Sequence, residues 1–301
     1  MSLMTMQKTM YRFIYRNKSR MIGMLLLAPY LIGVAILILY PLSQTVIHSF
    51  TDTIDGEQFV GIQNFLSMKD SRAFQSAIGN SAIFYLISLP LMVVLPLIGA
   101  VLYTQNRQLD GLFHHTVFLS ILLPTAALMQ FADLLFSEVG MLTESLCALF
   151  DLPAGSLYDT PLARPLLIFL FLFKYGGYNA LVFYAAIRQI PEERYESAKI
   201  DGAGTLACFR YITLPALRPA FPTVLLLSVL NSYKVYREAF QIGGTYPHDS
   251  IYLIQHYIHN NFLNMNYTRL CCISVLLLAV GIVAAIICGI LYRAGEGANE
   301  T

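Results

Sequence analysis

Charged side chains are scarce in this chain, and tryptophan is absent. Asp, Glu, Lys and Arg make up 12% of the 301 residues, whereas they account for about a quarter of a soluble domain. Hydrophobic residues make up 56%, and the mean hydropathy is +0.60. The formal net charge of +1 gives no overall basic surface for binding nucleic acid. This composition excludes a soluble domain and indicates a protein embedded in a lipid bilayer.

Motifs for catalysis and for binding metals or nucleotides are also missing from the sequence. There is no G-x-x-x-x-G-K-[ST] loop, and the adjacent glycines Gly176 and Gly177 lie inside an apolar run. No nucleophile elbow supports Ser/His/Asp catalysis. The cysteines show no C-x-x-C or Cys/His ligand spacing: Cys147, Cys208, Cys271, Cys272 and Cys288. We therefore predict no metal site, no catalytic residue and no cofactor bound by this chain.

Six apolar runs are long enough to cross a bilayer as helices, which requires about twenty residues each. They lie near residues 21–48, 77–103, 112–136, 166–187, 215–240 and 270–292. Several contain proline, which neighbouring helices tolerate in a membrane bundle. The sequence therefore predicts an all-α integral membrane protein in which residues 21–292 form one domain of six transmembrane helices.

The positions of lysine and arginine predict which side of the membrane each loop occupies. Segment 1–20 contains no acid and five basic residues: Lys8, Arg12, Arg16, Lys18 and Arg20. Six spans place a loop at 106–111, a polar segment at 190–219 and the tail 293–301 on the same side as segment 1–20. The loops of the opposite side are mostly acidic. We expect both termini and the polar segment to be cytoplasmic.

The polar segment 190–219 separates the fourth and fifth spans. Proline and two acids at its start are typical of a helix N-terminus, so we expect a short helix over about 191–201. Gly202 permits a sharp reversal because it has no Cβ. A second short helix is expected over about 205–211, and Leu214-Pro215 is expected to begin the fifth span.

The spacing inside this segment is specific. Glu196-Ser197-Ala198 is followed by Gly202 and then by Ile212-Thr213-Leu214-Pro215. This resembles the coupling motif of ABC importer permeases, E-A-A, three residues, G, nine residues, I-x-L-P, with serine replacing the first alanine. The alternative interpretation is a solvated amphipathic loop.

The resemblance extends beyond this motif. Tyr40-Pro41 and the stretch F-V-G-I-Q-N-F at 59–65 are similar to the opening of the sugar-type branch of this family, and I-G-G-T-Y-P at 242–247 is similar to its glycine-rich segment before the last span. The chain thus resembles a permease subunit of a type I, binding-protein-dependent carbohydrate ABC importer. Tryptophan, which that family often places in the fourth and fifth spans, is absent.

The resemblance implies a fold, partners and a site. Segment 190–219 would dock on ATP-binding subunits through residues matching the motif or its surroundings: Glu196, Ser197, Ala198, Asp201, Gly202, Ala203, Ile212, Leu214 and Pro215. Two such subunits would bind ATP and Mg²⁺. A second homologous permease, expected to be a different chain, and an extracytoplasmic solute-binding protein would complete the importer in a bacterial cytoplasmic membrane.

Polar residues at membrane depth in the fourth and fifth spans are candidates for the substrate path, because such residues are costly unless they face a cavity or one another. They are Lys174, Tyr178, Asn231, Tyr233, Lys234, Arg237 and Glu238. Lys234 and Glu238 are four residues apart, which predicts an ion pair on one helical face. The surplus of cations suggests an acidic sugar such as a uronate oligosaccharide. The alternative is that these charges only pair among themselves.

Other functions remain open from the sequence. A stand-alone secondary carrier or channel for small polar solutes would also be a polytopic helical protein, but would have no need of the motif in segment 190–219. An ABC permease for a non-sugar solute, such as a glycerol phosphate, would keep that motif.

Overall fold

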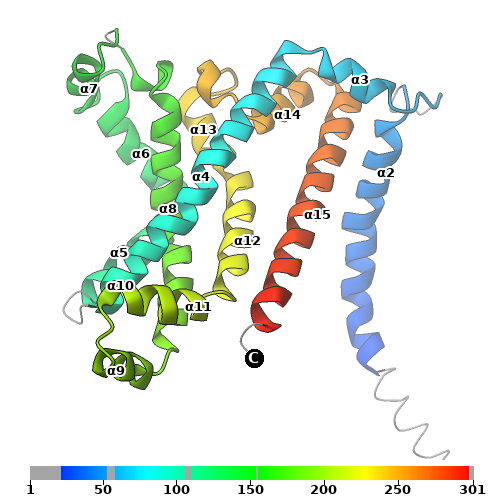
Figure 1. Cartoon of the computed structure of the whole chain (residues 1–301). Helices are drawn as coiled ribbons and strands as arrows, with labels where there is room; N and C mark the ends of the chain where they lie inside the picture. Colours follow the sequence, from blue (N-terminus) through cyan, green and yellow to red (C-terminus); the bar gives the residue numbers. More distant parts are fainter. Residues whose placement is uncertain (1–21, 53–57, 106–109, 154, 298–301) are drawn as a thin grey trace, which may run out of the picture. The chain divides into compact units, whose positions relative to one another are not determined.

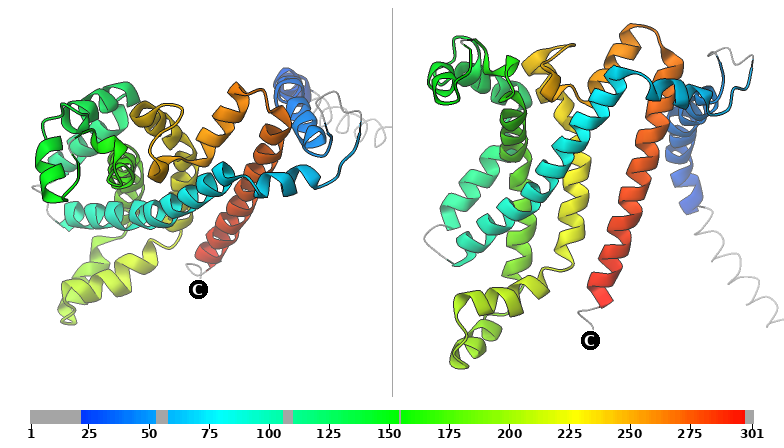
Figure 2. Two further views of the ribbon diagram at one scale, coloured as in Figure 1. Left: turned by 90° about the horizontal axis from the view of Figure 1, so that it is seen from above. Right: turned by 45° about the horizontal axis from the view of Figure 1, so that its top comes forward.

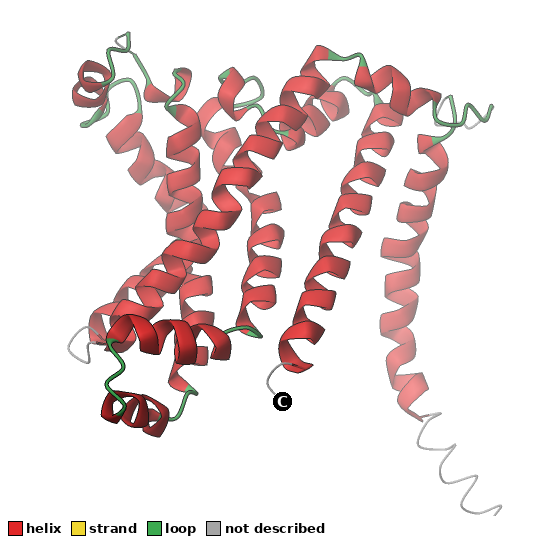
Figure 3. Cartoon of the chain, in the orientation of Figure 1, coloured by secondary structure: helices red, strands yellow, loops and turns green. Residues whose placement is uncertain are grey.

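The computed structural model describes residues 22–52, 58–105, 110–153 and 155–297, so segment 1–20 and the end of the tail lie outside it. The described residues are helical throughout, with turns between the helices (Figure 3) and no strand longer than the isolated bridge between Thr51 and Phe59. The chain divides into two compact units, one made of residues up to Leu66 with Tyr267–Val275, and one made of Ser67–Asn266 with the residues from Leu276 on. The all-α prediction is confirmed.

In the first unit, a polar network fixes the end of the first helix. The helix Ile22–Ser49 includes a π-helical turn, Ala35–Leu39, followed by α2, Tyr40–Ser49. The Asn64 side chain donates hydrogen bonds to the carbonyl oxygens of Ser49 (3.1 Å) and Thr51 (2.8 Å). Ser49 is the last residue of α2, so its carbonyl has no partner within the helix, and the Asn64 side chain supplies one.

The second unit contains most of the helices, arranged as Figures 1 and 2 show. They are α4 (Arg72–Gln105), α5 (Asp110–Leu122), α6 (Thr125–Phe136), α7 (Thr143–Leu149), α8 (Ala163–Arg188), α9 (Glu192–Ile200), α10 (Thr205–Cys208), α11 (Leu214–Ala216), α12 (Ala220–Ser232), α13 (Tyr236–Gly243) and α14 (Ile254–Leu263). The short α3 (Gln63–Lys69) lies at the junction, and α15 (Tyr267–Gly297) begins in the first unit and continues into the second.

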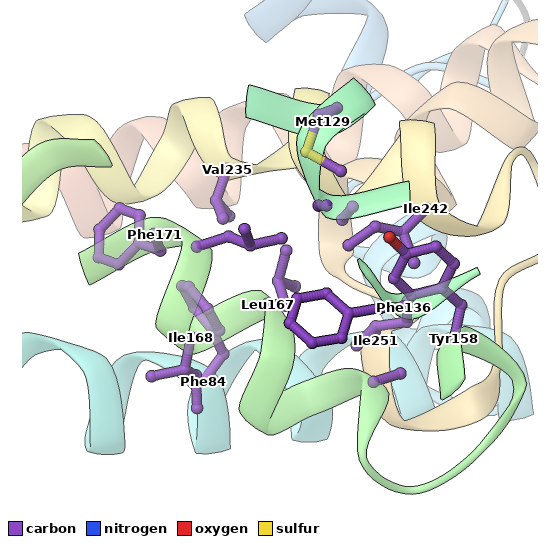
Figure 4. Packing of buried hydrophobic residues seen from close by; sticks show 14 of the residues in the cluster. Phe84, Met129, Phe136, Tyr158, Leu167, Ile168, Phe171, Val235, Ile242 and Ile251 are labelled. Carbon is purple, nitrogen blue, oxygen red and sulfur yellow. The ribbon is translucent and has the colours of Figure 1, made fainter. Parts of the chain in front are cut away.

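Helix α8 is the centre of the second unit. It packs against α4, α5 and α12, and its buried aromatic and aliphatic side chains form the core seen in Figure 4, where Leu167, Ile168 and Phe171 meet Phe84 of α4. The rings of Phe84 and Phe171 lie 5.4 Å apart in an edge-to-face arrangement. The two long helices also contact the shorter α5, α12 and α14.

One buried amide joins three helices in the middle of this core. The Asn179 side chain of α8 is fully buried and donates 2.8 Å hydrogen bonds to the Met92 carbonyl of α4 and to the Ser228 hydroxyl of α12. Polar side chains are found at such helix interfaces in membranes because they hydrogen-bond across them. Asn179 therefore fixes the register of α8 against its two neighbours.

The span count differs from the predicted six. Among the described helices, four are long and apolar enough to cross a bilayer: Ile22–Ser49, Arg72–Thr104, Ala163–Arg188 and Tyr267–Arg293. A fifth candidate span is made of two helices, Thr205–Ala216 and Ala220–Gly243, with a bend of 72° between them. The predicted third span 112–136 is two helices, α5 and α6, because Pro124 is extended and ends the first helix. Six continuous spans are therefore not confirmed.

Candidate functional site

The polar segment 190–219 folds into two short helical pieces joined by a tight turn. Pro191 caps α9, whose first turn contains Glu192 and Glu193, as expected from the helix dipole. The second piece, Thr205–Ala216, is longer than predicted. Pro215 lies inside this piece instead of starting the fifth span, and the long apolar helix begins only at Ala220.

Gly202 makes the reversal between the two pieces. Its φ of +81° lies in the left-handed region, which favours glycine. The amide of Gly202 donates to the Lys199 carbonyl at 3.0 Å, and the amide of Ala203 donates to the Ala198 carbonyl at 2.8 Å. This is the Schellman pattern of a helix C-terminus, so the prediction of a glycine turn is confirmed.

A side-chain hydrogen bond holds the two pieces at a fixed angle. The hydroxyls of Tyr195 on α9 and Thr213 lie 2.9 Å apart, and Thr213 is buried. Between the pieces is an open groove of about 600 Å³, whose lining residues are Glu193, Arg194, Ser197, Ala198, Asp201, Tyr211, Ile212, Pro215 and Ala216. Five of the predicted coupling residues therefore meet at one groove.

The remaining predicted coupling residues do not line this groove. Glu196 and Gly202 are exposed, Ala203 and Leu214 are half-buried. Ser197, which replaces the alanine of the motif, turns its hydroxyl back on the helix and donates to the Glu193 carbonyl at 2.8 Å. The substitution is therefore compatible with the helix.

Two exposed apolar residues beside the glycine turn were not predicted from the sequence. Ile200 is 87% exposed and Leu206 is 79% exposed, on either side of the glycine turn. Both side chains lie next to the glycine turn and outside the long apolar helix that begins at Ala220. In the sequence they are the two aliphatic residues on either side of the stretch D-G-A-G-T at 201–205.

A buried ion pair joins α8 to α13. Lys174 Nζ lies 3.2 Å from Glu238 Oε1, and the two side chains are 12% and 0% exposed. The Tyr175 hydroxyl donates to the same carboxylate at 3.4 Å, and Lys174 also contacts the Thr125 hydroxyl of α6. The pair thus lies at the meeting point of three helices.

This finding corrects the predicted pairing of Lys234 with Glu238. Lys234 instead donates to Asn231 Oδ1 at 3.1 Å. Residues Tyr233–Val235 form a 3₁₀ turn between α12 and α13. That turn has three residues per turn, so residues four apart across it no longer share a face.

The predicted path residues therefore fall into two groups. Lys174 and Glu238 neutralise each other inside the core. Lys234, Arg237 and Tyr178 are exposed, while Tyr233 is half-buried and Asn231 is buried beneath Lys234. Cations exposed on an otherwise apolar helix require water or a polar partner next to them.

At the opposite end of the unit from α9, the segment between α13 and α14 is tied to two helices. Arg164 at the start of α8 donates to the Ser250 carbonyl (2.8 Å) and to Asn80 Oδ1 of α4 (2.6 Å). Ser81 accepts from the Ile254 amide at 2.8 Å. These contacts give that segment a fixed conformation.

His256 in α14 is buried beside aromatic rings. Its Nδ1 accepts from the Leu253 amide at 3.2 Å, and its ring lies edge-on to that of Tyr236. Burial, and secondarily the nearby His259, lowers the pKa of His256 to about 4. It is therefore neutral at physiological pH. Within the described part of the chain, no three His, Cys, Asp or Glu side chains are placed to hold a metal ion.

The sequence matches a known protein family and several known permease proteins. The model of a protein family described as "Binding-protein-dependent transport system inner membrane component" matches residues 4–295. The lactose transport system permease protein LacF of Rhizobium radiobacter is 28% identical over 244 residues, covering 79% of this chain and 82% of LacF. The sulfoquinovosyl glycerol transport system permease protein SmoG of Agrobacterium fabrum is 29% identical over 262 residues, covering 82% and 83%.

A solved structure shows the same fold. A chain of a bacterial ABC transporter involved in the import of the acidic polysaccharide alginate superposes with a TM-score of 0.76, at 20% identity, over 96% of this chain and 98% of that one. A second structure of the alginate transporter, in complex with an alginate pentasaccharide-bound periplasmic protein, gives a TM-score of 0.70 at 20% identity, over 94% and 96%.

Proposed function

We infer the function from family membership. The chain belongs to the binding-protein-dependent transport system inner membrane components. We propose that it forms half of the translocation path of an ATP-driven carbohydrate importer. Its relatives are sugar permease subunits, so it is a transport component of a multi-pass membrane complex. The second half of the path comes from a homologous permease subunit that is a different chain.

The observation that supports this role is the groove between α9 and the piece Thr205–Ala216. Five motif residues line it, the hydrogen bond between Tyr195 and Thr213 joins the two helical pieces, and the left-handed Gly202 makes the reversal between them. In the proposal, α5 and α6 together cross the membrane once, so that this end of the unit lies on the cytoplasmic side with the basic segment 1–20. Two ATP-binding subunits hold ATP and Mg²⁺, and one of them receives the helix α9.

The rigid turn suits the transmission of movement. The piece Thr205–Ala216 leads within four residues into α12, which packs against α8 and α4. A displacement of α9 is therefore passed to the helices that carry Lys234 and Arg237. A stand-alone carrier has no need of the two short helical pieces of segment 190–219.

We propose further that the solute is an acidic sugar. With Lys174 neutralised by Glu238, the exposed cations at the junction of α12 and α13 are Lys234 and Arg237, three residues apart. Lys234 lies in the 3₁₀ turn Tyr233–Val235, where residues three apart face the same way, so the two side chains together attract a carboxylate or sulfonate. Exposed Tyr178 offers a ring face to the C–H surface of a sugar.

Co-purification tests the proposal. The chain is expressed with a tag together with the genes beside it, solubilised, and analysed by mass spectrometry of the purified complex. We expect two copies of an ATPase subunit and one of a second permease. Purification of this chain with no ATPase subunit, from membranes in which that ATPase is present, contradicts the importer role.

A further inference from the structure

Three buried polar groups on α13 and α14 have no hydrogen-bond partner within the described part of the chain. They are His256 Nε2, the Tyr236 hydroxyl and Asn260 Oδ1. The His256 side chain is fully buried, and Asn260 is 6% exposed. Buried polar groups are nearly always paired, either with protein or with ordered water. These three groups therefore need a partner that the side chains around them do not supply.

The three groups gather around the His256 ring. The ring of Tyr236 lies 5.0 Å from it, edge-on at 77°. Asn260 is one turn further along α14 on the same face, and it donates to the hydroxyl of Tyr252, whose ring lies 5.7 Å from that of His256. No hydrogen bond joins any two of the three groups. Polar groups that are too far apart for a direct bond are commonly joined by a water molecule.

His256 offers this site a donor. Its Nδ1 accepts from the Leu253 amide at 3.2 Å, so the single proton of the neutral ring lies on Nε2. The ring stays neutral at physiological pH because burial lowers the pKa of His256 to about 4. A buried N–H group without an acceptor destabilises the folded state, so an acceptor at Nε2 is expected.

Asn260 offers an acceptor. Its Nδ2 donates to the Thr245 carbonyl at 3.2 Å and to the Tyr252 hydroxyl at 3.3 Å. A carbonyl oxygen can only accept, so the contact with Thr245 fixes which end of the amide is the nitrogen. Oδ1 is therefore a true acceptor that needs a donor, and the Tyr236 hydroxyl can serve in either role.

This mixture of groups selects the chemistry of the occupant. An anion would be repelled by Asn260 Oδ1, and a cation would be repelled by the proton on His256 Nε2. The neighbouring rings lie within 5.7 Å of the His256 ring and leave it no exposed surface, which excludes a group as large as a sugar. A water molecule accepts and donates at once and makes about three hydrogen bonds in a buried site.

We propose that one buried water molecule joins α13 to α14, accepting from His256 Nε2–H, donating to Asn260 Oδ1 and sharing a hydrogen bond with the Tyr236 hydroxyl. Tyr236 is followed directly by Arg237, one of the exposed cations of the predicted solute path. The water thus helps to position the segment that carries this cation. The site lies wholly within this chain, so it depends neither on the identity of the solute nor on that of the partner subunits.

Nuclear magnetic resonance tests the water directly, on the complete importer in proteoliposomes with this chain ¹⁵N-labelled at histidine. The signal of His256 is the one missing from His256→Asn. We expect the proton on Nε2 and a cross-peak between it and water. Because the Tyr236 hydroxyl proton exchanges with water, the cross-peak is measured again in Tyr236→Phe, where it should persist. A proton on Nδ1, a proton on Nε2 that points at a ring face and shows no cross-peak to water, or loss of the cross-peak in Tyr236→Phe overturns the proposal.

Removal of the Tyr236 hydroxyl gives a second test with a predicted sign. A hydroxyl that binds the water loses a hydrogen bond in Tyr236→Phe, so the midpoint of thermal unfolding in detergent should fall by about 2–4 °C. Removal of a hydroxyl that has no partner leaves the midpoint unchanged or raises it.

Tyr257→Phe is the matched control for this measurement. The Tyr257 hydroxyl is also buried without a partner among the described residues, but its ring packs on Phe74 of α4. We expect an unchanged or higher midpoint for this variant. An unchanged or higher midpoint for Tyr236→Phe, or an equal fall in both variants, overturns the proposed site.

Discussion

Lys174 and Glu238 form a buried salt bridge of 3.2 Å that joins α8 to the first turn of α13. In this contact two charges are removed from water, so each depends on the other. A second partner of Glu238 is the Tyr175 hydroxyl, whose burial and hydrogen bond support the same carboxylate. The pair thus fixes the segment that carries Arg237.

The first prediction concerns this salt bridge. Lys174→Met leaves a buried, unpaired carboxylate and should reduce the free energy of unfolding by about 3–5 kcal/mol. The double variant Lys174→Met with Glu238→Leu removes both charges and should recover most of that loss. The measurement is thermal unfolding in detergent. Equal stability of the single variant and the wild type would contradict a structural role for the pair.

A second prediction concerns the close contact between α5 and α8. A Cβ at Gly177 would collide with the Ser120 hydroxyl, so Gly177→Ala should destabilise the protein by about 1–3 kcal/mol through overpacking. The companion substitution Ser120→Ala should restore part of it. Gly79→Ala in α4 is the matched control, because nothing lies within 4 Å of its Cβ position. That change should be neutral or slightly stabilising. Equal effects of the two glycine substitutions would rule out the close contact.

A third prediction concerns pH. The pKa of His256 is lowered from 6.5 to about 4 in the folded protein, so between these values the unfolded chain binds more protons than the folded one. Stability should therefore fall as the pH drops below about 6.5 and level off below about 4. His256→Asn, whose amide oxygen can accept from the Leu253 amide, should remove much of this dependence, whereas His248→Asn should keep it.

The cysteines offer a means to measure this. All five are buried free thiols, so they react with a thiol-specific dye only when unfolding exposes them. Samples are incubated at each pH and then labelled at one common pH, and the dye fluorescence reports how much of the protein has unfolded. A pH profile of His256→Asn that matches the wild type would exclude His256 as the source of the acid sensitivity.

A fourth prediction concerns the solute. Lys234→Ala should reduce ATPase stimulation by a binding protein loaded with a uronate oligosaccharide several-fold, because a charge-assisted hydrogen bond is lost. Stimulation by a binding protein loaded with a neutral sugar should change little. Lys69→Ala, an exposed lysine of α3, is the control. An equal response to both solutes would contradict the acidic-sugar proposal and leave the importer role in place.

Much of the architecture could be predicted from the sequence because it depends on local patterns. Long apolar runs predicted α4, α8 and α15 near their observed positions, and proline with two acids predicted α9. The reversal at Gly202 followed from the requirement for positive φ. These features depend on neighbouring residues only.

Features that depend on distant residues could not be predicted. Lys174 and Glu238 are 64 positions apart, and a 3₁₀ turn at Tyr233–Val235 breaks the spacing that suggested Lys234 as the partner of Glu238. Pro124 was expected to be tolerated in one span, but the chain is extended there and two helices form. The sequence also gave no sign that Asn179 would join three helices.

The most direct test of the account is ATP-driven solute uptake by proteoliposomes that contain the complete importer with Gly202→Asp. The aspartate must adopt a φ of +81°, which costs about 1–2 kcal/mol and distorts the turn that positions α9. The control is Gly204→Asp, because Gly204 has a φ of −75° and caps α10, where aspartate is favoured. We predict at least a tenfold loss of uptake, as an order of magnitude, for Gly202→Asp with ATP hydrolysis retained, and normal uptake for Gly204→Asp. Wild-type uptake by the Gly202→Asp importer would contradict the coupling role of this segment.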